Sequence, residues 1–442
     1  MPIQVITGSL AVRKGTTLRI REISTHLLLF LSVLGAQAQA DTQGGTAGPD
    51  VTVHEIVGVQ YGGSDGSLRA YTVGTTSCNQ GDEPVEWCDD STCAPGAEVT
   101  DHPVIGQNLY RLKDGRFEQL GMSWLKHGFF ALSNSDDECG DGSCETPDYN
   151  GDQLGIGCTD PYSATLNADR PLGKRSTVNP TTGDHPVRPN SGGSGIEELL
   201  QVEETEIDPT VNPSALYWVE AHYVTPDDAS RGNGLNNASH RTATFNQTLD
   251  MSLTGNTARE KAAIFAWQVA DPAVEIISTD IPASVPAERF HVARRVTAED
   301  GYWHYEYAIH NLNSDRSARL FRIQLPTGTT IYNVGFRDVD HHSGEPYDTT
   351  DWASAFAVVS GTVEWSTTPF DTDKDANALR WGTTYSFWFD ADAPPTGAVH
   401  TLEFFKPGSP TDVVVPFPDG GLFADGFETQ DTTAWAATRP EP

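Results

Sequence analysis

The sequence predicts a mainly β protein, in which a larger disulfide-containing β-rich domain is followed by an antiparallel β-sandwich of the immunoglobulin-like kind. The clearest support is the segment 303–310, WHYEYAIH, where large apolar residues fall on every other position. Alternation with a period of two buries one face of a strand and leaves the other face to solvent. Similar short runs recur along the chain between clusters of Gly, Pro, Asn and Asp, which is typical of a sandwich.

The segment 281–288, IPASVPAE, contains two prolines and predicts a boundary between a first domain at 53–282 and a β-sandwich at 283–410. One helix is expected at 257–269, because Thr257 and Glu260 form a capping box ahead of an apolar stripe. We expect strands at 53–59, 67–73, 106–112 and 215–224, then at 290–296, 303–310, 318–325, 356–359, 384–389 and 401–405.

Residues 1–40 have the pattern of a signal peptide. Basic residues precede a short apolar core at 27–34, and Ala38-Gln39-Ala40 offers small side chains for cleavage. A polar leader follows at 41–52. The apolar core at 27–34 is too short to span a bilayer, and no other stretch is long and apolar enough to do so. The sequence therefore predicts a chain without a transmembrane segment. We expect it to be secreted or held on the outer cell surface, with the periplasm as the alternative.

The chain is strongly acidic, and this excludes one class of partner. Its net charge of -33 becomes -36 when residues 1–40 are removed, since they contain four basic residues and one acid. Nucleic-acid binding depends on Lys and Arg to neutralise phosphates. The sequence therefore predicts no nucleic acid as a partner.

Six cysteines lie in two groups, Cys78, Cys88 and Cys93, then Cys139, Cys144 and Cys158. In an exported chain an even number of cysteines predicts disulfides, here three of them. A zinc site is the rival interpretation, but zinc ligands usually come in tight Cys-x2-Cys pairs, which are absent from this sequence. Six cysteines allow fifteen pairings, and the sequence does not choose among them.

Three acidic segments could hold a cation. Asp371, Asp373 and Asp375 alternate like the start of a calcium loop, although Ala376 stands where that loop needs Gly and Gly382 where it needs Glu. The alternative for this segment is a solvated acidic turn. The same alternatives apply to the acidic loop Asp136, Asp137, Glu138 and Asp141. The run 338–342, DVDHH, could hold a transition metal or form a polar edge strand.

The candidate catalytic residues come from polar positions among large apolar ones: His102, Lys126, His127, Asp160, Tyr162, Arg175 and His222. Buried polar groups are costly unless they are paired, so this pattern indicates either a hydrogen-bonded core or a cleft lined for chemistry.

In the catalytic interpretation, His127 or Tyr162 acts as acid or base, and Lys126 or Arg175 neutralises a substrate carboxylate, as in a polysaccharide lyase. Alternatively, His102, His127 and His222 ligate a metal that activates water in a hydrolase. The non-catalytic alternative is a cell-surface adhesion or carbohydrate-binding protein. An extracellular polymer, such as a polysaccharide, is the expected partner in each case.

Several segments resemble an uncharacterised family of large secreted bacterial proteins rich in β-structure. The resemblance is carried by 107–112 (QNLYRL), 116–119 (RFEQ), 123–129 (SWLKHGF) and 157–163 (GCTDPYS). It implies export and β architecture and brings no activity. Within the C-terminal tail at 411–442, the letters DGFE and DTTAW resemble a short tail found on secreted proteobacterial proteins, which implies a sorting signal. A frayed terminus is the alternative.

Overall fold

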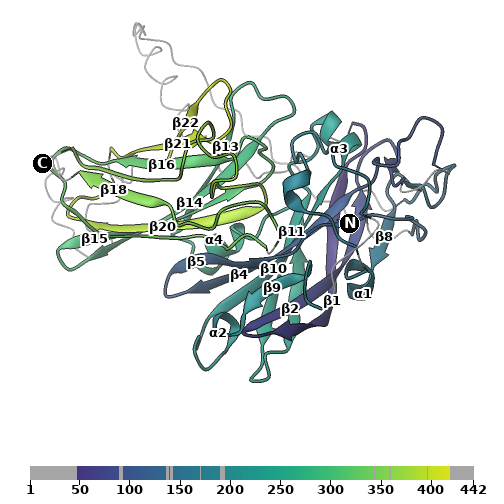
Figure 1. Cartoon of the computed structure of the whole chain (residues 1–442), viewed down its shortest axis with the longest axis horizontal. Helices are drawn as coiled ribbons and strands as arrows, with labels where there is room; N and C mark the ends of the chain where they lie inside the picture. The colour runs from purple at the N-terminus through teal and green to yellow at the C-terminus, as the bar shows by residue number, and fades with distance from the viewer. Residues whose placement is uncertain are drawn as a thin grey trace, which may run out of the picture. The chain divides into compact units, whose positions relative to one another are not determined.

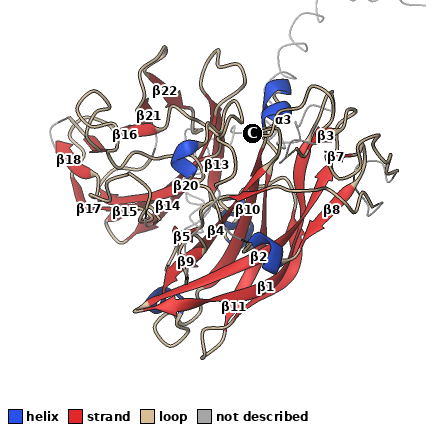
Figure 2. Cartoon of the chain, turned by 45° about the vertical axis from the view of Figure 1, so that its right-hand side comes forward, coloured by secondary structure: helices blue, strands red, loops and turns tan. Residues whose placement is uncertain are grey.

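The computed structural model describes residues 47–88, 93–135, 139, 143–169, 171–189, 195–342, 344–357, 360–395 and 397–418, all within one compact unit (Figure 1). The predicted signal peptide, residues 41–46 of the polar leader, the acidic loop residues 136–138 and 141, and residues 419–442 of the tail lie outside the described residues. Within the described part the chain is mainly β, as predicted, and its few helices are short (Figure 2). No helix in that part is both long enough and apolar enough to cross a membrane.

The first half contains two antiparallel sheets that share a hydrophobic core. One has the order β1-β2-β8, with β9 also paired to β2; the other has the order β12-β11-β10-β4-β5, with β6 paired to β4. A small third sheet pairs β3 with β7. The bounds are β1 (Val51–Asp65), β2 (Leu68–Asn79), β3 (Val85–Glu86), β4 (Val104–Lys113), β5 (Arg116–Met122), β6 (Lys126–His127), β7 (Gln153–Leu154), β8 (Thr159–Tyr162), β9 (Leu200–Glu203), β10 (Leu216–Val224), β11 (Ala238–Phe245) and β12 (Met251–Ala258).

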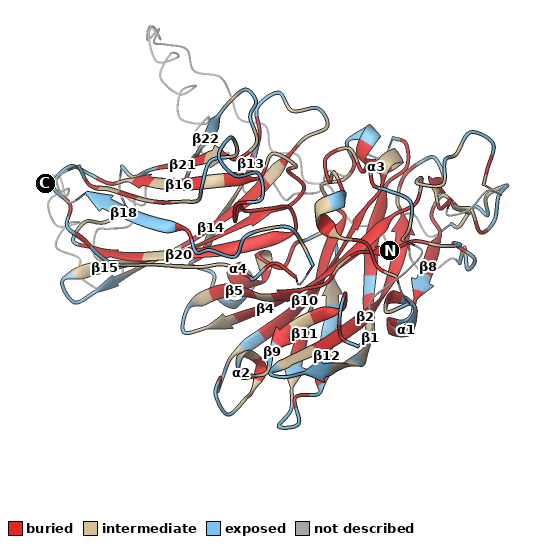
Figure 3. Ribbon diagram, in the orientation of Figure 1, coloured by how far each residue is buried: buried red, intermediate tan, exposed pale blue. Residues whose placement is uncertain are grey.

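The second half is a β-sandwich of two five-stranded sheets, with orders β13-β14-β15-β20-β17 and β18-β19-β16-β21-β22. Alternate residues of β15 and β20, among them Tyr305, Tyr307 and Phe387, point into one core between the sheets. β18 is exposed along its whole length (Figure 3). The bounds are β13 (Glu275–Asp280), β14 (Arg289–Glu299), β15 (Tyr302–Asn311), β16 (Ala318–Gln324), β17 (Ile331–Arg337), β18 (Ala353–Ala357), β19 (Thr362–Ser366), β20 (Thr383–Ala391), β21 (Val399–Phe404) and β22 (Asp412–Val415).

The two halves pack on each other through a third apolar cluster, which joins Phe117 and Trp218 of the first half to Ala293 and Ala308 of the second. The central strands β4 and β10 are therefore covered on both faces, and nearly all their residues are buried. β13 precedes the predicted boundary segment at 281–288, yet it pairs with β14 of the second half.

The predicted helix at 257–269 is wrong in its first half. Thr257 lies in β12, and its hydroxyl accepts a hydrogen bond from the backbone N–H of Ile56 (3.0 Å). Glu260 has a positive φ of 59°, which an α-helix cannot contain. Only α4 (Phe265–Ala270) is helical there. The other helices are α1 (Ala164–Asn167), the 3-10 helix η1 (Arg175–Thr177), α2 (Glu204–Ile207) and α3 (Pro226–Arg231).

The prediction of three disulfides is confirmed. They join Cys78 to Cys139, Cys88 to Cys93, and Cys144 to Cys158, and no cysteine is free. All three lie in the first half, where short strands alternate with long loops. Cross-links of this kind stabilise a loop-rich region chiefly by restricting its unfolded state.

Candidate functional site

The seven residues predicted to act in catalysis are all buried. None is more than 5 % exposed: His102, Lys126, His127, Asp160, Tyr162, Arg175 and His222. Side chains buried to this degree cannot touch a polymer without local opening of the fold. Their contacts therefore decide whether they form a site or support the structure.

Tyr162 and Asp160, both on β8, are engaged with the protein itself. The Tyr162 hydroxyl accepts from the indole N–H of Trp87 (2.8 Å) and donates to the backbone carbonyl of Phe129. Asp160 accepts from the backbone N–H of Ser133 (2.9 Å), and burial raises the pKa of its carboxyl to about 6. Burial also raises the pKa of Tyr162. These contacts hold the loop after β6 against β8.

Arg175 directs four of the five N–H groups of a guanidinium into the interior. They donate to the carbonyls of Ser123 (2.7 Å), Gln107 (3.0 Å) and Gly382 (3.3 Å), and to the side-chain oxygen of Asn108 (2.9 Å). Burial lowers the pKa of Arg175 to about 10. Most of the N–H groups of Arg175 are therefore bonded within the protein. The lyase interpretation requires them to bind a substrate carboxylate.

Glu220 completes this interior network at the junction of the halves. Its carboxylate accepts from Asn108 (2.8 Å), from the hydroxyl of Tyr110 (3.1 Å) and from the backbone N–H of Ala263 (2.6 Å). His222 lies on the same face of β10, two residues along, and packs edge-on against Trp381 with ring centres 5.9 Å apart. Burial lowers the pKa of His222 to about 4.

His102 and His127 do come together, but their third partner is His185 and not His222. The three residues each offer a ligand atom within 4.8 Å of the others, and they are the only such group of three found among the described His, Cys, Asp and Glu. Burial is the main cause that lowers the pKa of His102 to about 3 and that of His127 to about 2. Lys126 lies beside them, with its Nζ 3.7 Å from Asp169 Oδ2. Sequence reasoning missed His185 because nothing but its residue type distinguishes it in the long polar stretch 133–195.

The predicted calcium ligands Asp371, Asp373 and Asp375 lie on an exposed turn. The Asp373 carboxylate accepts from the backbone N–H of Asp375 (2.9 Å), which closes the turn. In the run 338–342, Asp338 accepts from the side-chain amide of Asn377, and burial raises the pKa of its carboxyl to about 6. His342 bonds the carbonyl of Leu199 (2.9 Å).

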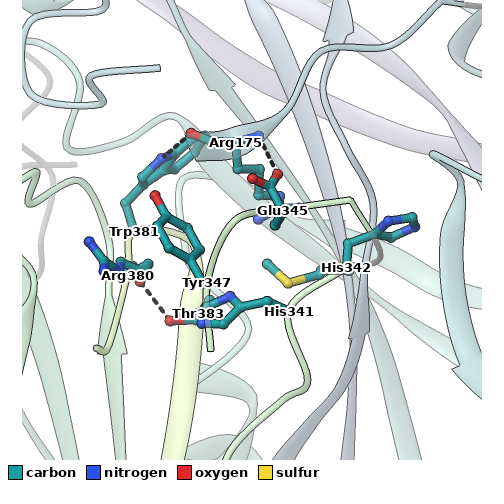
Figure 4. A pocket seen from close by; sticks show the side chains of 9 residues that line it. Arg175, His341, His342, Glu345, Tyr347, Arg380, Trp381 and Thr383 are labelled. Atoms are coloured by element: carbon teal, nitrogen blue, oxygen red, sulfur yellow. Dashed lines mark hydrogen bonds between the residues drawn. The ribbon is translucent and has the colours of Figure 1, made fainter. Parts of the chain in front are cut away.

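Two hollows lie where the halves meet. The cavity in Figure 4 is lined by Arg175, Glu345, Arg380 and Trp381 among others, and its volume of about 10 Å³ has room for one water at most. A groove of about 620 Å³ lies between β5, β9 and the segment 337–342. Its volume suits a ligand, but no Phe, Tyr or Trp is among its described lining residues, so it offers no ring on which a sugar could stack.

A set of aromatic and charged side chains lies on the outer face of the β13–β17 sheet. It comprises Tyr302, His304, Glu306, Tyr332, Trp388 and Asp390, and is called here the outer-face patch. Residues 303, 305 and 307 of β15 pack toward the sandwich core, which turns 302, 304 and 306 outward. At the other end of the same face, the Ser386 hydroxyl donates to the backbone carbonyl of Phe117 on β5 (2.7 Å). The first half thus covers one end of this face. Within the patch Tyr332 is exposed, Tyr302, His304 and Trp388 are half-buried, and Glu306 and Asp390 are buried.

A network of ion pairs holds the patch in place. His304 bridges Asp390 (2.6 Å) and Glu306 (3.0 Å), and Arg116 makes two hydrogen bonds to Glu306 (3.0 and 2.7 Å). The guanidinium of Arg116 also lies 3.4 Å from the centre of the Trp388 ring.

Two further features shape the patch. Trp388 lies directly over Gly335, where an added Cβ would fall 2.0 Å from the ring, so only glycine fits there. Tyr332 is 41 % exposed and meets Tyr302 edge-on at 5.9 Å. The alternation in 302–310 already indicates that Tyr302, His304 and Glu306 face outward, but nothing in that segment points to Tyr332, Trp388 or Asp390.

The His304 bridge predicts a pH dependence of stability. The hydrogen bond to Glu306, followed by the one to Asp390, raises the pKa of His304 above its ordinary 6.5. When folding raises the pKa of a histidine, the resulting stabilisation is complete below the pKa of the unfolded state. It is lost as the pH rises through the pKa of the folded state. We expect the difference in free energy of unfolding between wild type and H304Q to be largest near pH 5 and to shrink toward about pH 9. Urea unfolding across this range measures it, and a constant difference would contradict the bridge.

Comparison with known proteins adds little. No family model and no curated protein matches this chain. Among solved structures, a serine-rich repeat adhesion glycoprotein from Streptococcus agalactiae matches with 8 % identity and a TM-score of 0.19, over 83 % of this chain and 98 % of that one. A TM-score this low does not establish a shared fold, so the function of this chain has to be inferred from its own residues.

Proposed function

We propose that the protein is a non-catalytic binding protein of the cell exterior, and that it holds an uncharged polysaccharide on the outer-face patch. The observation that carries this proposal is the patch itself, in which the exposed ring of Tyr332 and the partly exposed ring of Tyr302 lie beside a network of ion pairs. Location outside the cell is supported by the three disulfides, since such bonds persist in oxidising compartments.

The burial of the predicted catalytic residues favours binding over catalysis. A lyase needs a cation at the substrate carboxylate and a base within reach of a proton. Lys126 and Arg175, the two predicted cations, are 1 % and 5 % exposed, and Arg175 is bonded to protein carbonyls. His222 does not join His102 and His127, so the predicted three-histidine hydrolase site is not assembled from those residues.

The chemistry of the outer-face patch suits sugar hydroxyls and the apolar faces of sugar rings. Tyr and Trp present an apolar ring with a polar end, which suits a half-wet ligand. Glu306 and Asp390 are 4 % and 6 % exposed, and all their carboxylate oxygens are bonded within the protein. These carboxylates fix the patch before a ligand arrives, which lowers the entropy cost of binding. The net charge of -33 repels acidic polymers, which is why the proposal specifies an uncharged one.

We expect Y332A to weaken binding to an uncharged polysaccharide by about tenfold, equivalent to about 1.4 kcal/mol, through loss of one stacking ring. The test is affinity electrophoresis through gels containing a panel of soluble uncharged and acidic polysaccharides. Y149A is the matched control, because Tyr149 is also 41 % exposed but lies on a loop of the first half. Its affinity should equal that of wild type.

The same panel should be assayed for new reducing ends and for unsaturated products. Binding without product supports the proposal. Product formation by the wild type contradicts the non-catalytic assignment, and equal weakening by Y332A and Y149A, or no retention by any uncharged polymer, contradicts the site.

A further inference from the structure

The cluster of His102, His127 and His185 joins three segments distant in the sequence. His102 directly precedes β4, His127 ends β6, and His185 lies on the loop that follows η1. The three rings contact one another, with centres 4.6, 5.1 and 5.2 Å apart. Each ring has a polar nitrogen on either side, so the cluster gathers six polar nitrogens in one buried place.

The facing nitrogens have spacings suitable for a tetrahedral metal. His102 Nε2 and His127 Nδ1 form a hydrogen bond of 2.9 Å, which a shared ion would replace, and the full set of ligand atoms lies within 4.8 Å. Two nitrogens bound to one tetrahedral zinc at 2.0–2.1 Å are about 3.3 Å apart. The observed range brackets that value, so small rotations of the rings bring all three onto one ion.

The outward nitrogen of His102 has the kind of partner that a metal-bound histidine usually has. A ligating histidine generally donates its other N–H to a backbone carbonyl or carboxylate. His102 Nδ1 donates to the carbonyl of Cys88 (2.6 Å), which leaves the lone pair of Nε2 directed into the cluster. The two nitrogens of His185 lie 2.9 Å from the carbonyl of His102 and 3.0 Å from that of Pro186. A neutral ring has only one N–H, so one of these nitrogens faces its carbonyl with a lone pair, and that nitrogen would turn from the carbonyl to bind a metal.

We propose that His102, His127 and His185 bind a zinc ion, which fixes the loop around His185 to the β4–β6 edge of the sheet. Three imidazoles are a donor set that zinc favours, with the fourth position left for water. This site is separate from the outer-face patch and does not depend on the proposed function.

Two cations lie near the cluster and limit its affinity. Lys126 Nζ and Arg188 Nη2 are 3.7 and 3.4 Å from the same oxygen of Asp169. That carboxylate offsets part of the repulsion they exert on a dication. The site should therefore favour zinc, which binds imidazole strongly, over calcium, which requires oxygen ligands.

The test is zinc binding by the whole, tag-free chain. Binding is measured by isothermal titration calorimetry and by mass spectrometry of the metal content after dialysis. We expect about one zinc per chain for wild type, and at least about 100-fold weaker binding for H185N. H222N is the matched control, since His222 is also buried but lies outside the cluster, and it should bind zinc as wild type does. Cobalt substitution gives a second readout, because tetrahedral cobalt absorbs visible light strongly.

Wild-type protein that takes up no zinc overturns the proposal, and so does H185N that retains it. If H185N is too unstable to purify, wild-type uptake together with tetrahedral cobalt absorption supports the proposal, and octahedral cobalt absorption contradicts it. Polysaccharide binding is measured separately on the metal-stripped chain. Each proposal can therefore be contradicted without affecting the test of the other.

Discussion

R175M should lower the free energy of unfolding by about 3–5 kcal/mol, because it removes a buried charge and leaves its acceptors without donors. The guanidinium links Gln107 and Asn108 of β4 to Gly382, just before β20 of the second half. Methionine fills the space but cannot donate to any of these oxygens. Denaturant unfolding followed by fluorescence measures the loss.

The neighbouring K174M provides the matched control. Lys174 is only partly buried and lies over the Trp124 ring at 5.4 Å, so its loss should change stability by no more than about 0.5 kcal/mol. The pair of variants also separates the two interpretations of Arg175. If R175M unfolds at the same denaturant concentration as wild type, the guanidinium does not support the fold, and a role in binding substrate regains support.

Local pattern predicted most strands because alternation is a property of the chain itself. The expected strand at 303–310 coincides with the interior of β15, where the residues that alternate inward form the sandwich core. The predicted helix failed for a tertiary reason. Residues 257 and 258 extend β12 along β11, and pairing with that strand outweighs the local preference of a capping box.

The role of the polar residues on β4 could not be predicted from the sequence. The pattern of a single strand does not show whether its second face is also covered by protein. Gln107 and Asn108 are polar residues in an otherwise apolar strand, a pattern that fits either a hydrogen-bonded core or a cleft. In the structure Gln107 bonds the backbone of Val73 in the facing sheet, and Asn108 bonds Gly382 of the second half. Whether such a residue meets solvent or another part of the protein depends on packing between segments about 270 residues apart.

The outer-face patch illustrates the same limit of sequence-based prediction, here for residues on the surface of a sheet. His304 and Glu306 face outward by alternation alone, but their partner Asp390 is set by the register of β15 with β20, in which His304 pairs with Asp390. Register between distant strands comes from the whole sheet and not from either segment. A pattern of Tyr, His and Glu on one strand face therefore indicates a polar surface, but it does not identify the site.

Removal of the Cys78–Cys139 disulfide should destabilise the protein more than removal of either other bridge. In the loop-closure treatment the stabilisation grows with the length of chain enclosed. The sequence separations are 61 for Cys78–Cys139, 14 for Cys144–Cys158 and 5 for Cys88–Cys93. The expected losses for the paired alanine variants are about 4, 3 and 2 kcal/mol respectively.

Each double variant serves as the control for the others, because all three remove two sulfurs and differ mainly in the loop they release. Thermal and urea unfolding under non-reducing conditions give the order. Cys78 lies at the end of β2 and, like Cys139, is fully buried. The bridge therefore also fixes Cys139 against the β1–β2 sheet. If the C88A/C93A variant lost the most stability instead, the dominant contribution would be local to the turn before His102, and the entropy of the unfolded chain would not be the main source of stabilisation.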